Sequence, residues 1–206
     1  MALFITFEGG EGAGKTVQTK ALYRRLSRLA IPALLTYEPG GTPLGKKVAR
    51  WLKGAQSTGI SPLTELLMFN ASRAELIKEV IQPNLKSGTV IICDRYTDST
   101  IAYQSYARGL DLEIVKYINN TATQGLKPHL TILLDIPTKE GFARKRDKKH
   151  DRFEQEDMSF HKKVREGYLK LAAGEPQRWL IIDAQQSKEK IREIIWQRVS
   201  QLLKTQ

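Results

Sequence analysis

Short apolar runs rich in β-branched residues recur along the chain, and longer stretches with a helical spacing of apolar positions separate them. The runs are Leu3–Phe7, Ala33–Tyr37, Thr89–Cys93, Leu130–Leu134 and Trp179–Ile182. Continuous apolar strands are typical of a parallel sheet buried on both faces, and parallel neighbours need long crossover connections such as helices. The pattern therefore predicts an α/β fold built on a parallel sheet.

Three of the intervals have a clear helical pattern. Residues 61–86 are long enough for several helical turns, in which Pro62 suits the first turn and Pro83 should end or kink the helix. The stretches 160–171 and 187–203 each repeat apolar positions along one helical face. No repeat, linker or low-complexity tract divides the sequence, so we expect one domain over residues 1–206.

Composition narrows the class of protein. The chain has 206 residues, of which 41% are hydrophobic and 27% charged, as in ordinary globular domains, so a disordered or fibrous protein is excluded. No apolar run approaches the about 20 residues of a membrane span. The first residues do not have the pattern of a signal peptide, so we expect a cytoplasmic protein.

Cysteine and histidine usage argues against a disulfide framework or a zinc site. Cys93 is the single cysteine of the sequence and has no CxxC partner. His129, His150 and His161 lack the HExxH spacing of a zinc-binding helix. We expect Cys93 to be a small buried residue and the three histidines to be solvated.

The charge balance favours an anionic partner. The sequence has 33 Lys and Arg against 22 Asp and Glu, which gives a net charge of +11. Basic residues crowd the segment 144–152, a pattern that a solvated surface also produces. Charge alone does not choose between nucleic acid, a nucleotide and an acidic membrane.

The strongest chemical signal follows the first predicted strand. Residues 9–16 read GGEGAGKT, which matches GxxxxGK[ST] and leads into an amphipathic stretch containing Leu22, Leu26 and Leu29. In such a loop the backbone N–H groups surround phosphate oxygens, Lys15 reaches the β- and γ-phosphates, and Thr16 can bind Mg²⁺. The motif predicts a site for a nucleoside triphosphate without specifying the reaction.

A second signal is Asp94-Arg95-Tyr96, which follows the predicted strand Thr89–Cys93. Ligands of open α/β sheets bind at the carboxyl ends of the strands, where these side chains should lie. Asp94 can hold Mg²⁺ or orient an acceptor. Arg95 can grip a phosphate with its planar guanidinium.

Five segments together resemble the thymidylate kinase family, specifically its bacterial branch, over nearly the whole chain. They are the phosphate loop after Phe7-Glu8-Gly9, then Glu38-Pro39-Gly40-Gly41-Thr42, Asp94-Arg95-Tyr96, Ala102-Tyr103-Gln104 and Asp151-Arg152-Phe153-Glu154. The resemblance implies the P-loop nucleoside monophosphate kinase fold, with a five-stranded parallel sheet flanked by helices and a short lid near residues 141–153. It also implies Mg²⁺-assisted, in-line phosphoryl transfer from ATP to dTMP, a homodimer, and no nucleic-acid or membrane partner.

The same resemblance implies the residues of the site. The ATP-binding positions are Gly9, Gly10, Glu11, Gly12, Ala13, Gly14, Lys15, Thr16 and Val17. The dTMP-binding positions are Glu11, Glu38, Phe69, Arg73, Arg95, Thr100, Tyr103 and Gln104. The catalytic positions are Lys15, Asp94, Arg95, Arg144, Arg146 and Lys148, and the Mg²⁺ ligands are Thr16 and Asp94. Which basic residue of the lid stabilises the transferring phosphoryl group stays open.

The family pattern also implies individual roles at the acceptor. Phe69 matches the aromatic residue that stacks on thymine, although core packing also fits its identity. Arg73, four residues later on the same helix face, matches the arginine that bonds a base carbonyl. The remaining matches are Thr100 and Gln104 at the base edge, Tyr103 at the sugar and Glu11 at the 3′-hydroxyl.

Three positions depart from the family pattern. Tyr37 stands where an arginine usually begins the second-strand motif, Val17 replaces a second threonine, and Ala49 replaces an arginine of the following helix. Arg50 is adjacent, but one residue turns about 100° around a helix. We therefore expect a weaker grip on the acceptor's phosphate than in relatives, with Arg95 as its main contact.

Two other functions fit parts of the pattern. One is a kinase for another nucleotide or a deoxynucleoside, which a panel of acceptors would separate. The other is a P-loop switch or an ATPase stimulated by nucleic acid. A guanine-nucleotide switch should carry Asn-Lys-x-Asp and an Asp-x-x-Gly after the third strand, and the sequence has neither.

Overall fold

The computed structural model describes residues 2–54, 59–144 and 151–204. Within these residues five parallel strands form a sheet in the order β2-β3-β1-β4-β5. The strands are β1 (Phe4–Glu8), β2 (Ala33–Tyr37), β3 (Val90–Asp94), β4 (Leu130–Asp135) and β5 (Trp179–Asp183). The predicted α/β class and parallel sheet are confirmed, and the strand ends differ from the prediction by at most one residue.

Helices connect the strands, and polar side chains at their N-caps stabilise the first turns of four of them. The α-helices are α1 (Lys15–Arg28), α2 (Pro43–Lys53), α3 (Pro62–Leu76), α4 (Gln82–Lys86), α5 (Thr97–Thr100), α6 (Leu112–Thr123), α7 (Thr138–Ala143), α8 (Met158–Gly174) and α9 (Lys188–Lys204). Two further segments, η2 (Ile77–Ile81) and η3 (Ile101–Ala107), are π-helical. Side-chain oxygens of Thr42, Ser61, Asp111 and Asp157 accept backbone hydrogen bonds at the starts of α2, α3, α6 and α8.

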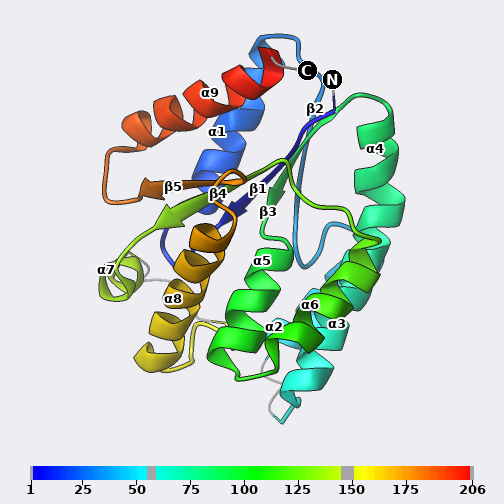
Figure 1. Cartoon of the computed structure of the whole chain (residues 1–206), viewed down its shortest axis with the longest axis vertical. Coiled ribbons are helices and arrows are strands. Elements are labelled where there is room, and N and C mark those ends of the chain that lie inside the picture. Colours follow the sequence, from blue (N-terminus) through cyan, green and yellow to red (C-terminus); the bar gives the residue numbers. More distant parts are fainter. Residues whose placement is uncertain (1, 55–58, 145–150, 205–206) are drawn as a thin grey trace.

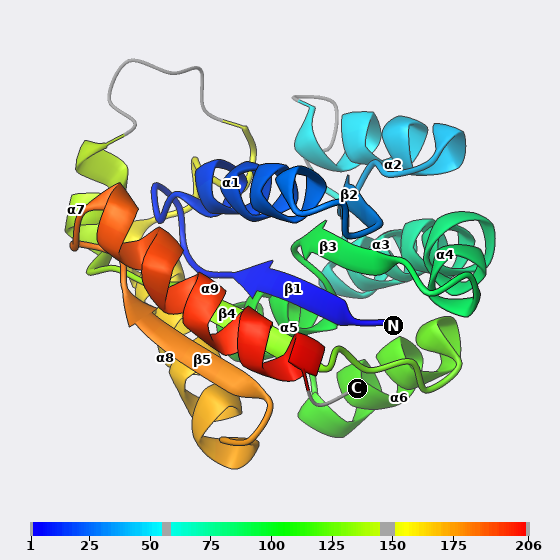
Figure 2. The same cartoon turned by 90° about the horizontal axis from the view of Figure 1, so that it is seen from above.

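The sheet is covered on both faces (Figure 1, Figure 2). α1 and α9 pack together over one face, where they meet Ile5 and Phe7 of β1. Phe4 points the other way and packs against Leu76 and Ile77. Because successive strand residues point to opposite faces, burial on both sides requires the unbroken apolar runs seen in the sequence. None of the described helices is long and apolar enough to cross a membrane.

The long helix predicted for residues 61–86 is present, but Pro83 does not end it. α3 passes into the π-helical segment η2 and then into α4, which carries Pro83 in its first turn and ends at Lys86. Proline has no N–H and its ring clashes with a carbonyl one turn earlier in an α-helix. The wider π-helical turn immediately before Pro83 changes this spacing, and the chain stays helical.

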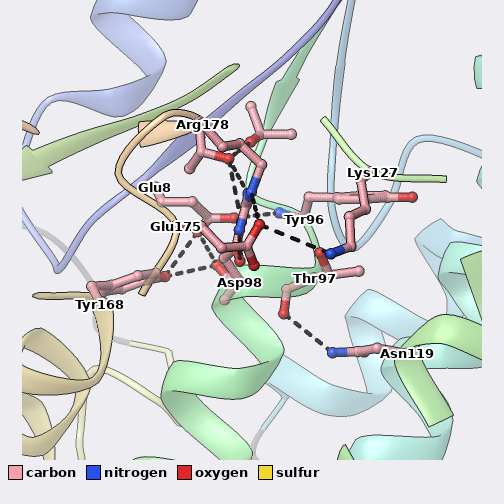
Figure 3. A network of polar contacts seen from close by, with 12 residues as sticks. Glu8, Tyr96, Thr97, Asp98, Asn119, Lys127, Tyr168, Glu175 and Arg178 are labelled. Carbon is pink, nitrogen blue, oxygen red and sulfur yellow. Dashed lines mark hydrogen bonds and ion pairs between the residues drawn. The ribbon is translucent and has the colours of Figure 1, made fainter. Parts of the chain in front are cut away.

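A buried ion pair fixes the segment that follows β3. Arg178, in the turn between α8 and β5, donates to the two carboxylate oxygens of Asp98 on α5, at 2.7 and 3.0 Å (Figure 3). The Thr131 hydroxyl on β4 also contacts both partners. This two-point geometry holds α5 in a defined orientation against β4 and the turn that carries Arg178.

Two expectations about single side chains have different outcomes. Cys93 is fully buried in β3, as expected, and burial raises the pKa of its thiol well above the usual value. His161, which the sequence analysis expects to be solvated, is buried on α8 with its ring 4.6 Å from that of Phe142. The expectation was wrong because the buried face of α8 is wider than its apolar stripe. Burial lowers the pKa of His161, which favours a neutral imidazole.

The carboxyl ends of the strands meet at one edge of the sheet. The last residues of the strands are Glu8, Tyr37, Asp94, Asp135 and Asp183. β1 lies in the middle, and the chain passes from β3 on one side of it to β4 on the other. Such a switch point is where ligands of open α/β sheets bind.

Candidate active site

A cleft of about 1200 Å³ opens at this edge of the sheet. It extends from the phosphate loop and α1 to β2, α3, α5 and η3, and its far end reaches the residues after β5. Cavities for one small molecule typically enclose about 300–1,000 Å³. The cleft is therefore large enough for two nucleotide-sized ligands at once.

The phosphate loop adopts a conformation that needs glycine. Gly9 has a φ of +141°, and a Cβ there would lie 2.5 Å from the carbonyl oxygen of Leu134 on β4. Gly14, with a φ of +88°, is the N-cap of α1. The loop therefore turns sharply from β1 into the N-terminus of α1, where free N–H groups and the helix dipole favour an anion.

Lys15 lies inside this loop. Its ammonium group donates to the carbonyl oxygens of Gly9 and Gly10, each at 2.9 Å, so the lysine is held by the loop itself. Burial, with a smaller contribution from Arg95, lowers the pKa of Lys15 to about 8. A phosphate anion would restore the ordinary preference for the charged form.

The two sequence-predicted metal ligands are brought together. The hydroxyl of Thr16, in the first turn of α1, donates to Asp94 Oδ2 at the end of β3, at 2.7 Å. Both side chains line the cleft. Among the described residues no three His, Cys, Asp or Glu side chains form a metal cluster. This arrangement fits Mg²⁺, which is usually bound by one or two protein oxygens together with phosphates and water.

Arg95 lies at the centre of a group of predicted acceptor-binding residues. Its Nη2 donates to Glu11 Oε1 at 2.8 Å, and its guanidinium carbon lies 5.2 Å from the centre of the Tyr103 ring. The Tyr103 hydroxyl also donates to Glu11, at 3.3 Å. The structure therefore brings these three predicted acceptor residues into one group. Arg95 has a φ of +72°, an unfavourable value for a side chain with a Cβ.

Arg73 has more partners than its predicted role required. It is 1% exposed, forms an ion pair with Glu38 at 2.6 Å and donates to Thr100 at 2.9 Å. Its other donors contact Asn70, Asn119 and the Tyr96 carbonyl. All five guanidinium N–H groups thus have acceptors within the protein. Burial raises the pKa of Glu38, and the charge of Arg73 opposes that rise.

Two phenylalanines form an aromatic wall in the cleft. Phe69 on α3 is half-buried, and its ring centre lies 5.7 Å from that of Phe153. Both line the cleft together with Arg73 and Thr100. Phe153 was not among the predicted site residues, although it lies in one of the segments that carry the family resemblance.

Glu65 is a buried carboxylate that the sequence analysis missed. It is 1% exposed and accepts from the amide of Gln104 at 2.6 Å. It also pairs with Arg108 and Arg152. Glu65 thus fixes the orientation of the Gln104 amide, which lines the cleft beside Tyr103. The pairing joins α3, η3 and the turn after residue 150, so no local sequence signal reports it.

The predicted lid residues fall into two groups. Arg144 follows α7, lines the cleft, and donates to the carbonyl oxygen of Ala184 in the turn after β5, at 3.0 Å. Arg146 and Lys148 lie outside the described residues, as does much of the predicted lid.

The positions that depart from the family pattern occupy different surroundings. Tyr37 and Val17 are exposed and line the cleft. Ala49 and Arg50 do not line it, but Lys53, one helical turn after Ala49 on α2, does. A cation is therefore present near this wall, one turn from the position expected to carry arginine.

The phosphate loop and α7 touch through backbone atoms. A Cβ on Gly141 would lie 2.2 Å from the carbonyl oxygen of Glu11, and a Cβ on Gly12 would lie 1.9 Å from the carbonyl oxygen of Gly141. Such distances are far below any normal contact, so neither position has room for a side chain unless one backbone moves. α7 therefore packs directly against the phosphate loop.

Known proteins are similar to this chain in sequence and in fold. The sequence model of the family described as Thymidylate kinase matches residues 7–195. A thymidylate kinase of Dehalococcoides mccartyi is 54% identical over 204 residues, covering 99% of this chain and 99% of that protein. One from Synechococcus sp. is 50% identical over 194 residues, covering 94% of this chain and 92% of that protein. The crystal structure of thymidylate kinase from Ehrlichia chaffeensis matches with a TM-score of 0.72 and 35% identity, covering 87% of this chain and 91% of that one.

The contact between Gly141 and Glu11 predicts a strong effect of one added methyl group. We expect Gly141→Ala to displace the phosphate loop and lower the rate of ADP release from ATP by up to about 100-fold, since small displacements of reacting groups have effects of this size. Gly174→Ala is the matched control, because a Cβ there meets no atom within 4 Å. Equal turnover in both variants, measured by a coupled ADP assay, would show that the contact has no bearing on the loop.

Proposed function

This chain belongs to the thymidylate kinase family, which phosphorylates dTMP to dTDP with ATP, and on that premise we propose that the cleft binds both nucleotides with their phosphates between Lys15 and Arg95. The family model, the similar proteins and the solved structure confirm the fold and the family predicted from the sequence. The observation that carries the proposal is that a triphosphate loop and the partly buried Arg95 face one cleft large enough for two nucleotides.

On the donor side, the phosphate loop holds ATP. The loop amides and the N-terminus of α1 bind the phosphates, and Lys15 moves from the carbonyls of Gly9 and Gly10 to the β- and γ-phosphates. The adenine lies near the turn after β5, where Arg144 contacts Ala184. The other proposed contacts along the loop are Glu11, Gly12, Ala13, Gly14, Thr16 and Val17.

On the acceptor side, Arg95 binds the phosphate of dTMP and Glu11 receives the 3′-hydroxyl. The thymine stacks on the wall formed by Phe69 and Phe153. Its polar edge faces Glu38 and Thr100, which Arg73 holds together, and Gln104, which Glu65 orients. Glu38 supports this assignment because its Oε1 is buried and has no protein partner, so a ligand donor can satisfy it.

Catalysis then follows from position and charge. Lys15 neutralises charge on the transferring phosphoryl group, while Arg95 holds the acceptor oxygen in line with it. Asp94 and Thr16 would hold Mg²⁺, which would supply positive charge to stabilise the negative charge that develops on the phosphates. No covalent intermediate on the protein is required. The roles of Arg146 and Lys148 in the lid remain predictions.

We also propose a homodimer in the cytoplasm. Large apolar side chains are exposed on three helices, α2, α3 and α6, of which α3 packs against both others on one side of the molecule (Figure 2). They are Leu44, Trp51, Leu63, Leu67, Ile114 and Tyr117. Exposed apolar groups of this kind favour an interface with a second copy. A cytoplasmic location agrees with the buried, unpaired Cys93.

The nucleotide assignment predicts a ranking of acceptors. Among the nucleoside monophosphates, dTMP should give the highest kcat/KM in a coupled ADP-release assay. Phe69→Leu should raise the KM for dTMP about tenfold or more, because stacking on a base contributes about 1–3 kcal/mol, and should leave the KM for ATP unchanged. A better acceptor than dTMP, or turnover stimulated by DNA in its absence, would contradict the assignment.

The pKa of Lys15 predicts proton uptake when a nucleotide binds. At pH 8 the lysine is about half protonated, and the phosphates raise its pKa, so binding of ADP with Mg²⁺ should take up about half a proton. At pH 6.5 Lys15 is already protonated and its uptake should vanish. Titration calorimetry in two buffers of different ionisation enthalpy measures this number. Lys15→Met should abolish the pH dependence, and uptake that persists in this variant would assign the proton to another group.

The exposed helices predict a surface substitution that separates the two copies. Leu67→Glu should convert the dimer into a monomer in sedimentation velocity, because a charge on this face opposes its burial. Leu29 is also about half exposed but follows α1, outside the three helices, so Leu29→Glu should stay dimeric. A monomeric parent chain would rule out the homodimer.

A further inference from the structure

Two hydroxyl groups lie between a buried carboxylate and Arg95. Arg95 Nη1 donates to the Ser99 hydroxyl and to the Tyr168 hydroxyl, each at 3.2 Å. The same two hydroxyls donate to Glu8 Oε2, at 2.5 Å from Ser99 and 2.9 Å from Tyr168. None of these three partner residues was among the predicted site residues.

The chemistry of the groups fixes the direction of these hydrogen bonds. A guanidinium can only donate and an ionised carboxylate can only accept. Each hydroxyl must therefore point its hydrogen at Glu8 and its lone pairs at Arg95. The two hydroxyl oxygens are 2.8 Å apart, so together they form one compact pair of acceptors beneath Nη1. Without the carboxylate, nothing in this arrangement would orient both hydrogens away from Arg95.

The three partners come from separate and rigid parts of the fold. Glu8 ends the central strand β1 and Tyr168 lies on α8 (Figure 3). Ser99 lies on α5. Glu8 is fully buried and Tyr168 is 1% exposed. α5 is further fixed by the ion pair between Asp98 and Arg178 described above. These elements therefore hold the acceptors of the Arg95 guanidinium in place before any ligand binds.

Glu8 also holds the backbone beside Arg95. Its Oε1 accepts from the N–H of Tyr96 at 2.8 Å, and the N–H of Arg95 donates to the carbonyl of Phe7 on β1. These bonds secure the left-handed backbone at Arg95, which needs support from its surroundings. Burial and the charge of Asp98 raise the pKa of Glu8 to about 7, so the carboxylate is mainly ionised at pH 8.

We propose that Glu8, Ser99 and Tyr168 are positioning residues, which set the affinity for dTMP by holding Arg95 in the orientation that binds its phosphate. The proposal rests on the role of Arg95 in the proposed function. Tyr168 is the informative residue, because its hydroxyl contacts Arg95 while its ring packs in the apolar cluster of α8.

The first measurement is dTMP binding to Tyr168→Phe at pH 8 by titration calorimetry. This variant removes one hydroxyl and keeps the ring. We expect the Kd for dTMP to rise about tenfold, which is typical for a lost hydrogen bond to a charged group, with the KM for ATP unchanged. Tyr106→Phe is a matched control on η3, where the tyrosine ring packs against α8 at Gly167, and should bind dTMP like the parent chain.

The second measurement separates positioning from a general structural role. In an Arg95→Ala background, Tyr168→Phe should cause no further loss of dTMP affinity, because its target has been removed. An equal fold-loss with and without Arg95 would overturn the proposal. Normal dTMP affinity in Arg95→Ala would refute the proposed function, in which Arg95 binds the phosphate. If Tyr168→Phe alone still weakened dTMP binding in that case, Tyr168 would act without Arg95, and the positioning role would be overturned as well. Should Tyr168→Phe melt at a much lower temperature, Ser99→Ala takes its place in the same cycle.

Discussion

Buried carboxylates paired with arginines are the interaction on which the proposed acceptor side of the cleft depends. Glu38 pairs with Arg73 and Asp98 pairs with Arg178, and in both pairs the carboxylate is almost completely buried. A charge in such a place is strongly destabilising without its partner, so each pair can form in essentially one geometry. The side chains that face the ligands are therefore oriented before binding, which is the arrangement that electrostatic catalysis needs.

The proposed donor side is built differently. The shape of its phosphate loop comes from glycines that bring backbone atoms of β4 and α7 within contact distance. Lys15 contacts carbonyl oxygens of the loop itself. A triphosphate brings its own charges and is bound mostly by backbone N–H groups, whereas a single phosphate needs a positioned guanidinium. The two halves of the cleft, as assigned in the proposed function, match this difference between the two substrates.

The sequence predicted the parts of the structure that depend on local pattern. The strands follow from unbroken apolar runs, and Lys15, Thr16 and Asp94 follow from motifs at strand ends. It did not predict Glu65 or Glu8, because each acts through partners far away in sequence, such as the contact between Glu8 and Tyr168. The π-helical passage before Pro83 was missed for another reason, since proline is usually a sign that a helix ends or kinks.

The backbone contact between Gly12 and Gly141 also limits how the sequence can change over time. When two side chains touch, growth of one can be offset by reduction of the other. Here neither position has a side chain to reduce, and the opposing atoms are main-chain oxygens. A larger residue at one position thus has no single compensating substitution at the other. We conclude that the residues at positions 12 and 141 can change only if a whole loop or helix moves. The contact between α7 and the phosphate loop therefore cannot change by one substitution at a time.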